Sequence, residues 1–223
     1  KLPELEQFML HKIYTLNLNF DKYFKNYDFH NLYKELLNFC TVDLSAFYFD
    51  IRKDTLYCDS KESEKRKSTL ILLNIILDSL LKWFAPILSF TTEEIYQLVS
   101  KNKKSIHLER FLSFPKKFEN PELNLKWERL LKIRDVCNLS IEQKRANKEI
   151  GSSLEAALII KLNKENQNIL KGIDLSELCI TSSAKIENSN LDEVVVETSK
   201  AKGDKCSICW KIRTSPCERP NCK

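Results

Sequence analysis

The stretch YDFHNLYKELLNFCTVDLSAFYFDIRKD, residues 27–54, decides the fold class of this chain. Its apolar residues recur every three or four positions, a spacing that places a wide apolar stripe on one face of a helix. Asp28 stands where its carboxylate can cap the first turn. The stretch therefore predicts a long amphipathic helix that packs against other helices.

Segments on both sides of this stretch carry the same helical period and predict an antiparallel helical bundle. The expected helices span residues 3–26, 27–54, about 60–84, 91–100 and 120–149, with an extended crossing over residues 101–118. The predicted core of the bundle contains Phe29, Leu36, Phe47, Leu73, Leu80, Trp83 and Ile95.

Local signals mark the expected helix ends. Ser60 or Ser63 can accept a hydrogen bond from the free amides of the third helix. Thr91 and Glu94 have the spacing of a capping box, which predicts a helix start at Thr91. Pro121 suits the first position of the last long helix.

After Gly151, which we expect to end that helix, the apolar period changes to two. Residues 154–162, 178–186 and 193–198 are predicted strands, with a short helix over 165–171. The chain is thus predicted to be mainly α, with a helical bundle over residues 1–150, a small α+β subdomain over 151–199 and a zinc knuckle over 200–223.

Composition places the chain among globular proteins. With 223 residues, of which 43% are hydrophobic and 30% charged, it can bury a substantial core. Its longest apolar stretch, residues 70–90, is interrupted by polar residues and Pro86, so a membrane span is not expected. Because the sequence starts with Lys1 and shows no secretory leader, we expect a cytoplasmic piece of a longer protein.

The net charge of +5 is concentrated at the end of the chain. Residues 199–223 contain seven Lys or Arg and two acidic residues. Such a basic tail favours a polyanionic partner, because cationic side chains release the counterions condensed on phosphates. A solvated lysine-rich surface is an equally good explanation of the charge alone.

Four cysteines in KCSICWKIRTSPCERPNCK, residues 205–223, have the spacing of metal ligands. They are Cys206, Cys209, Cys217 and Cys222, arranged as C-x2-C followed by C-x4-C. Two close pairs let four thiolates meet one tetrahedral Zn²⁺ ion. Two disulfides are a weaker alternative, because no secretory leader is seen. The remaining cysteines, expected to be small buried side chains, are Cys40, Cys58, Cys137 and Cys179.

Four motifs in order carry a resemblance to one enzyme family. They are DLSAFY at 43–48, APILSFTTEEIYQLV at 85–99, IGSSLEAAL at 150–158 and KCSICW at 205–210. Together they closely resemble the C-terminal, anticodon-binding region of class I aminoacyl-tRNA synthetases, in particular the isoleucyl branch. The resemblance implies a cytoplasmic monomer that binds the anticodon stem-loop of isoleucine tRNA. The C-x4-C pair departs from the family, in which the second pair is usually C-x2-C and lies further away.

The chain lacks the ATP-binding motifs of that family. None of its three histidines, His11, His30 and His107, lies in a HIGH-like motif, and no KMSKS-like motif occurs. Three glycines cannot form a phosphate-binding loop. We therefore expect no catalytic residue here, and we expect the ATP and Mg²⁺ sites in a missing catalytic domain.

Candidate RNA-binding residues lie in two basic regions. Trp210 follows a predicted zinc ligand and could stack on a base, or it could cap the small core of the knuckle. The predicted cationic residues are Lys205, Lys211 and Arg213 in the tail and Lys144, Arg145 and Lys148 near the end of the last long helix. A basic loop with Lys101, Lys103 and Lys104 has similar potential. Solvated surface positions remain the alternative for all these cations.

Two other functions fit the same residues. The first is the equivalent region of a class I synthetase for valine, leucine or methionine, because those enzymes share the helical bundle. The second is a protein-interaction module stabilised by a structural zinc, which would show no salt-dependent affinity for tRNA.

Overall fold

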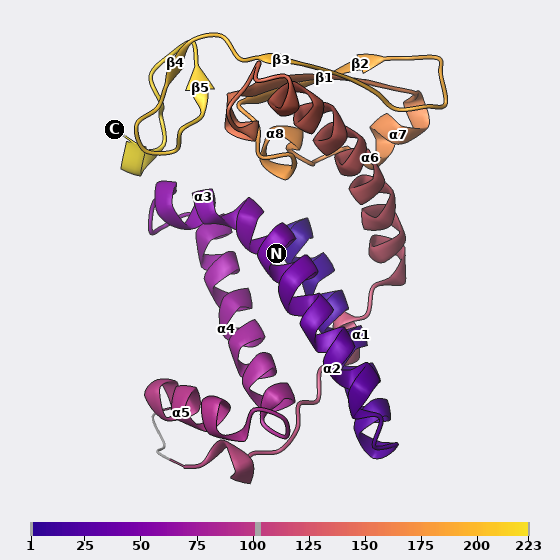
Figure 1. The fold of residues 1–223 in the computed structure, drawn as a ribbon, viewed down its shortest axis with the longest axis vertical. Helices are drawn as coiled ribbons and strands as arrows, with labels where there is room; N and C mark the ends of the chain where they lie inside the picture. Colours follow the sequence, from indigo (N-terminus) through magenta and orange to yellow (C-terminus); the bar gives the residue numbers. More distant parts are fainter. Residues whose placement is uncertain (1, 101–103, 223) are drawn as a thin grey trace. The chain divides into compact units, whose positions relative to one another are not determined.

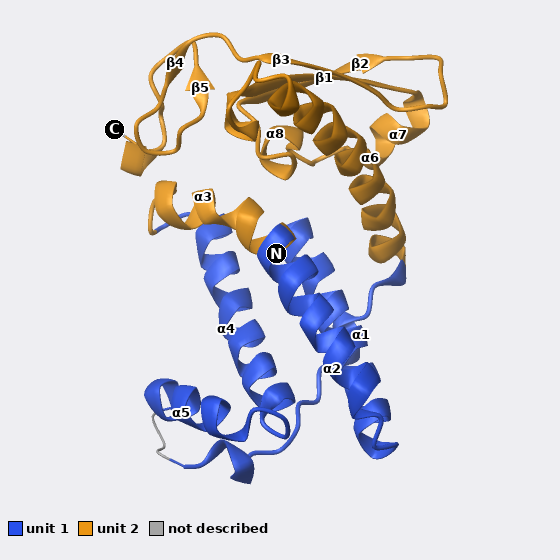
Figure 2. Ribbon diagram, viewed as in Figure 1, with its two compact units in different colours: residues 1–46, 62–121 blue, residues 47–61, 122–223 orange. Residues whose placement is uncertain are grey.

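The computed structural model describes residues 2–100 and 104–222, and it is mainly helical with two small sheets (Figure 1). The chain forms two compact units, one of residues 1–46 and 62–121 and the other of residues 47–61 and 122–223 (Figure 2). These units do not follow the expected boundary near residue 150. The three-part division therefore stays a prediction about which segments fold independently.

The first unit is built from four α-helices. They are α1 (Glu4–Lys25), α2 (Phe29–Asn38), α4 (Glu64–Phe84) and α5 (Ser89–Val99). Helix α1 packs against α2 and α4, and α4 packs against α5. The predicted helical bundle is thus confirmed for this part of the chain.

A tight turn joins α1 to α2. Tyr27 adopts a left-handed φ of 56°, and the amide of Asp28 donates to the carbonyl of Tyr23 at 2.9 Å. The Asp28 carboxylate then accepts from the amide of Asn31 at 3.2 Å, which confirms its predicted role as N-cap. Ser63 likewise caps α4, because its side chain accepts from the amide of Arg66.

The predicted helix over residues 27–54 is helical from Phe29 onward, but it is not one α-helix. Its middle, Phe39–Phe49, is a π-helix, and α3 (Asp50–Cys58) follows. A π-helix bonds residues five apart, so Phe39 and Leu44 are both buried. The wider turn changes which residues face inward. A search for the α-helical period alone cannot detect this change.

The predicted core is partly correct. Leu36, Phe47 and Trp83 are buried, Leu73 and Leu80 are half-buried, and Phe29 and Ile95 are exposed at 42% and 38%. Helix α4 instead turns Leu72, Ile76, Ser79 and Trp83 inward. Phe47 is buried in the second unit, where its ring meets the Trp127 ring at 6.2 Å.

The predicted capping box at Thr91 and Glu94 is wrong. Helix α5 begins earlier, at Ser89, because the backbone keeps turning after α4: the amide of Leu88 donates to the carbonyl of Phe84 at 2.7 Å. Phe90, the residue before Thr91, is 93% exposed. The carboxylate of Glu93 accepts from the amide of Ile106 at 2.8 Å and fixes the following loop. Within that loop lie two short 3₁₀ turns, Ile106–Leu108 and Lys116–Phe118.

The second unit places a helix on a three-stranded sheet. Its helix is α6 (Pro121–Ala146), and the strands are β1 (Ala156–Leu162), β2 (Ser183–Asn188) and β3 (Val195–Lys200). The central strand β1 runs parallel to β2 and antiparallel to β3. Alternate β1 side chains from Ala156 to Leu162 are buried, as are the inward residues of α6. Ser140 of α6 shares a 2.7 Å hydrogen bond with Thr198 of β3.

Two sequence predictions fail in this unit. Helix α6 starts at Pro121 as predicted but ends before Gly151, because Lys148 takes a left-handed φ of 59° and its amide returns to the carbonyl of Arg145. In the predicted strand at 178–186, Leu178 ends a helix, residues 179–182 form a turn, and only residues 183–186 are extended. Helices α7 (Lys164–Ile169) and α8 (Leu175–Leu178) form the crossover from β1, and only the end of the segment enters β2.

The tail completes the second unit. In the tail, a hairpin of β4 (Asp204–Lys205) and β5 (Ile212–Arg213) follows the three-stranded sheet, and a 3₁₀ turn spans Pro220–Cys222. Another 3₁₀ turn, Ser153–Glu155, lies earlier in the chain and precedes β1. Among the helices of the described residues, none is both long enough and apolar enough to cross a bilayer.

A buried amide in the first unit provides a test of its core. The indole of Trp83 donates to the Asn17 side-chain oxygen at 3.0 Å, and the Asn17 amide donates to the carbonyl of Leu112 at 3.1 Å. Asn17→Ala leaves both partners unpaired and should lower the free energy of unfolding by about 1–3 kcal/mol in urea titrations. Asn74→Ala is the control, since the exposed Asn74 side chain donates to the carbonyl of Leu70. Equal losses in both variants would contradict this assignment.

Candidate metal centre and RNA-binding surface

The β4–β5 hairpin brings the first two predicted ligands together. The amide of Cys206 donates to the carbonyl of Lys211, and the amide of Trp210 donates back to the carbonyl of Cys206, both at 3.0 Å. Trp210 closes this turn with a left-handed φ of 62°. Backbone amides of Cys209 and Ile208 point at the Cys206 sulfur and lower the pKa of that thiol to about 6. Cys206 is therefore readily available as a thiolate ligand.

Gly203 allows the hairpin to close. Its φ is +118°, and a Cβ atom at this position would lie 2.0 Å from the carbonyl oxygen of Arg213. Any side chain here would collide with backbone and not with a movable side chain. The approach of β4 to β5, and so the position of Cys206, depends on this glycine.

All four predicted metal ligands converge. The sulfur atoms of Cys206, Cys209, Cys217 and Cys222 lie within 4.8 Å of one another, and those of Cys209 and Cys217 are 3.9 Å apart. A regular tetrahedron with metal–sulfur bonds of about 2.3 Å has sulfurs about 3.8 Å apart. The four thiols therefore fit one tetrahedral metal ion. The C-x4-C spacing does not prevent this, because the final 3₁₀ turn brings Cys222 back to the others.

All eight cysteines lie in the part of the chain that the structure describes, and each is a free thiol. Burial raises the pKa of Cys209 and of Cys222, so these thiols differ from Cys206 in their environment. Away from the cluster, Cys58, Cys137 and Cys179 are buried as predicted, whereas Cys40 is half-buried. The structure thus agrees with a metal site better than with two disulfides.

Trp210 and Lys205 form an exposed pair beside the metal centre. The Trp210 side chain is 58% exposed, and the Lys205 ammonium lies 6.0 Å from the centre of its ring. Because more than half of its surface is exposed, the Trp210 indole contributes little buried surface to the core of the knuckle. A ring with one open face and a cation beside it can accept a nucleobase.

Two further tail cations are less accessible. Lys211 is 5% exposed, its ammonium is 3.5 Å from the carbonyl of Ser176, and burial lowers its pKa. Its burial argues against the predicted contact with a phosphate. Arg213 is half-buried, and its Nε atom is covered without a hydrogen-bond partner. A loop around Arg213, Thr214 and Ser215 lines an open cavity of about 320 Å³ next to the cysteines.

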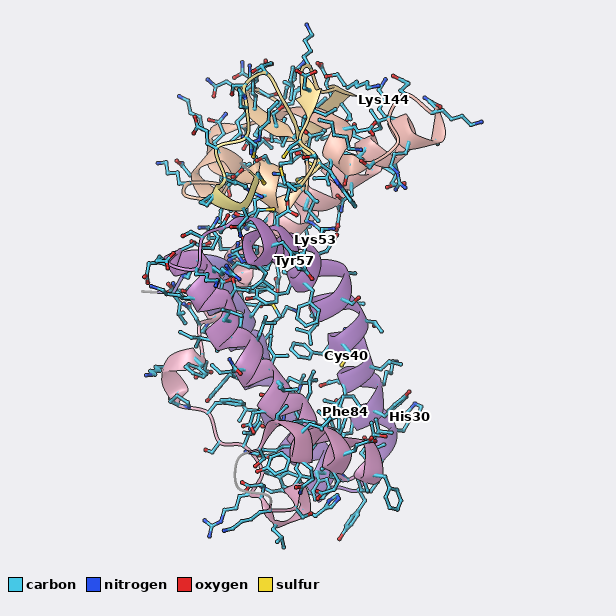
Figure 3. The ribbon with its side chains drawn as sticks, turned by 90° about the vertical axis from the view of Figure 1, so that its left-hand side faces the viewer. His30, Cys40, Lys53, Tyr57, Phe84 and Lys144 are labelled. Atoms are coloured by element: carbon cyan, nitrogen blue, oxygen red, sulfur yellow. The ribbon has the colours of Figure 1, made fainter. Side chains whose placement is uncertain are left out.

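The basic residues near the end of α6 are engaged with acids. Lys144, which Figure 3 labels, pairs with Glu149 at 2.8 Å, and Arg145 pairs with Glu142 at 2.7 Å. Exposed pairs of this kind are weak and can open toward a phosphate. Lys148 is exposed in the turn that ends the helix. In the other predicted basic loop, Lys104 is exposed, while Lys101 and Lys103 lie outside the described residues.

The histidines have structural or surface positions. His11 is buried, which lowers its pKa, and its Nδ1 atom accepts from the amide of Asn120 at 3.0 Å. His30 on α2 is exposed (Figure 3), and the His107 ring lies 3.2 Å from the carbonyl of Ser89. His11 therefore serves packing, and His30 lies on the surface of its helix.

Sequence reasoning missed a group of residues around Cys222. Asp54 comes from α3, and Arg219 and Asn221 come from the tail. No local motif links residues so far apart in the chain. Their association could be found only from the folded structure.

Comparisons with known proteins identify the relatives of this chain. Residues 6–160 match the family model described as the anticodon-binding domain of tRNA ligase. An isoleucine–tRNA ligase of Pelagibacter ubique is 66% identical over 219 residues, covering 98% of this chain and 24% of that protein. The isoleucine–tRNA ligases of Agrobacterium fabrum and Bartonella quintana are 40% and 39% identical, covering 96% and 94% of this chain and 23% of each relative. The chain thus spans about a quarter of the length of these relatives.

A glycine pair tests how the hairpin supports the metal centre. Gly203→Ala should weaken metal binding by at least about tenfold, since it displaces the strand that carries Cys206. Gly172→Ala is the control, because Gly172 also has a positive φ, of +83°, but a Cβ atom added there would meet no atom within 4 Å. Competition with a chromogenic chelator measures both affinities. If the two variants bind metal equally well, the hairpin does not position the site.

Metal content tests the cluster itself. The purified chain should contain about one metal ion, bound through sulfur at about 2.3 Å as measured by X-ray absorption. Cys209→Ser should abolish stoichiometric binding, whereas Cys40→Ser should leave it unchanged because Cys40 lies outside the cluster. Full metal content in Cys209→Ser would refute the proposed ligand set.

Proposed function

Because the chain belongs to the family of anticodon-binding domains of tRNA ligases, we propose that it is the tRNA-binding part of an isoleucine–tRNA ligase. The observation that carries this proposal is the 66% identity to such a ligase over 98% of the chain. In the proposed enzyme, other domains would attach isoleucine to tRNA with ATP while this part binds the anticodon stem-loop of isoleucine tRNA.

The surface chemistry supports an RNA partner. Anticodon bases are unstacked and can be bound by aromatic rings and by donors that reach their edges. Trp210 offers such a ring, and Lys205 offers a cation beside it. In this proposal Lys144, Arg145 and Lys148 contact phosphates, with the paired cations released from Glu149 and Glu142 on binding.

We propose that the metal is zinc. Four thiolates in a tetrahedral arrangement suit Zn²⁺, and a site with four protein ligands has no open position for chemistry. The zinc would hold the tail in the shape that presents Trp210. It would take no part in aminoacylation.

The ATP and Mg²⁺ sites of the proposed enzyme would lie in its other domains. The chain has neither a HIGH-like nor a KMSKS-like motif, so we expect it to be catalytically inactive alone. A cytoplasmic location and a monomeric state belong to the same proposal, as properties of an enzyme that charges tRNA.

Two competing functions differ from this proposal in measurable ways. A ligase for valine, leucine or methionine would prefer a different tRNA, and the similarity to isoleucine–tRNA ligases argues against it. A zinc-stabilised interaction module would bind a protein without preference for tRNA. The family match argues against that function.

A titration with tRNA tests the proposal. The chain should bind an isoleucine tRNA transcript more tightly than a valine tRNA transcript in fluorescence anisotropy. Each phosphate neutralised should contribute a slope of about −0.7 to −0.9 to log K against log salt concentration. Affinity that is independent of salt and equal for the two transcripts would contradict the proposal.

A substitution pair tests the role of Trp210. Trp210→Ala should weaken tRNA binding by about 1–3 kcal/mol, since the base loses its stacking partner, while metal content stays at its original level. Ile208→Ala is the control, because Ile208 lies in the same turn and is 52% exposed but has no ring. Loss of metal in Trp210→Ala, or equal loss of tRNA affinity in both variants, would show that Trp210 serves the knuckle and not the RNA.

A further inference from the structure

The β4–β5 hairpin lies in the same compact unit as the three-stranded sheet, and Trp210 stands between its two strands (Figure 2). Strands β4 and β5 pair only with each other, in a sheet separate from that of β1, β2 and β3. Strand pairing therefore does not determine how the hairpin is oriented on the larger sheet. Other contacts must do so.

The hydroxyl of Ser182 joins the hairpin to the beginning of β1. It accepts a hydrogen bond from the amide of Ile212 in β5 at 2.6 Å, and it donates to the carbonyl of Leu154, just before β1. A hydroxyl has one proton and two lone pairs, so it can serve both partners at once. One side chain thus connects the backbone of the hairpin to the backbone of the sheet.

The turn after α8 holds Ser182 in place. Ile180 takes a left-handed φ of 55°, and the amide of Thr181 donates to the carbonyl of Ser176 at 2.9 Å. The Thr181 side chain is fully buried, and its hydroxyl donates to the carbonyl of Ser183, the first residue of β2. Because the backbone is fixed on both sides of Ser182, its hydroxyl offers a stationary partner to the Ile212 amide.

Lys211 makes a second contact between the hairpin and the same turn. Its side chain is 5% exposed, and its ammonium lies 3.5 Å from the carbonyl of Ser176. Burying an ammonium is costly without an acceptor, so this position suits an internal contact and not a phosphate. Lys211 stands between Trp210 and Ile212 in sequence. Both contacts therefore act on the backbone directly after the exposed indole.

Glu155 shows that the two basic regions of this unit adjoin. Its carboxylate accepts from the amide of Gly151 at 3.0 Å and lies 3.9 Å from the ammonium of Lys205 in β4. Gly151 lines an open cavity of about 490 Å³ together with Arg145 and Lys148. The cations at the end of α6 and those of the hairpin are thus separated by a single side chain.

We propose that Ser182 is a positioning residue for RNA binding, whose hydroxyl, with the Lys211 ammonium, fixes the hairpin so that Trp210 and the cations at the end of α6 form one surface. In this inference the metal gives the hairpin its internal shape, and Ser182 gives it its orientation. RNA that contacts both regions then binds a surface that is already arranged, which strengthens binding. The inference rests on the proposed function, in which the partner is tRNA.

Amide exchange tests the orientation of the hairpin without RNA. In the complete 223-residue chain with Zn²⁺ bound, Ser182→Ala removes the acceptor of the Ile212 amide, whose exchange, measured by NMR, should accelerate by at least about tenfold. Ser182→Thr keeps a hydroxyl and should restore slow exchange. Ser183→Ala is the control, because Ser183 is the exposed neighbour. Unchanged exchange in Ser182→Ala, or loss of its metal, would overturn the inference.

A double-mutant cycle tests whether Ser182 acts through Trp210. Ser182→Ala should weaken binding of isoleucine tRNA by about tenfold in fluorescence anisotropy, at an unchanged metal content. In the Trp210→Ala background the same substitution should cause little further loss, because the ring that it positions is gone. Fully additive losses, or an unchanged affinity in Ser182→Ala, would overturn the role of Ser182 in RNA binding.

Lys211→Met tests the second contact, because methionine has a similar length and no charge. It should weaken tRNA binding, but the slope of log K against log salt concentration should stay the same. A slope reduced by about 0.7–0.9 would show that Lys211 neutralises a phosphate, and it would overturn its role inside the unit.

The two kinds of measurement separate this inference from the proposed function. If the unmodified chain does not bind tRNA, the proposed function fails, and the RNA-binding role of Ser182 fails with it. Accelerated exchange of Ile212 in Ser182→Ala would still establish that the hydroxyl fixes the hairpin on the sheet.

Discussion

The folded shape of the tail depends on the convergence of four cysteine sulfur atoms, because the tail has almost no apolar core. Between residues 199 and 222, the buried side chains are Cys209 and Lys211. So little buried surface cannot order a segment of this length, whereas a tetrahedral metal–thiolate centre can. The position of Trp210, the closing of the β4–β5 hairpin and the contacts of Asn221 with α3 all follow from holding these sulfurs together.

The sequence predicts the features that depend on neighbouring residues. Helical period identified α1, α4 and α6, and the caps Asp28 and Ser63 and the start at Pro121 were correct. The spacing of the cysteines also identified the cluster before its geometry was known. Each of these signals lies within a few residues, where local physical chemistry decides the outcome.

Other features depend on contacts that a local pattern does not contain. The π-helical segment Phe39–Phe49 replaces the α-period with a five-residue spacing, and the start of α5 follows from the turn after Pro86 instead of from Thr91. Likewise, Lys211 carries the charge expected of an RNA-binding residue, but its folded surroundings bury it. Ser182 lies within a predicted strand, and only the fold places its hydroxyl beside the amide of Ile212.

In the proposed function, the two kinds of residue have separate roles: the thiols order the tail by binding a metal ion, and the ordered tail offers an aromatic ring and cations to RNA. The most direct test compares the affinity for isoleucine tRNA of the metal-loaded chain, the metal-stripped chain and the stripped chain with Zn²⁺ restored. We predict that affinity falls when the metal is removed and returns when Zn²⁺ is added. Equal affinity in all three states would contradict a role for the metal-ordered tail in binding tRNA.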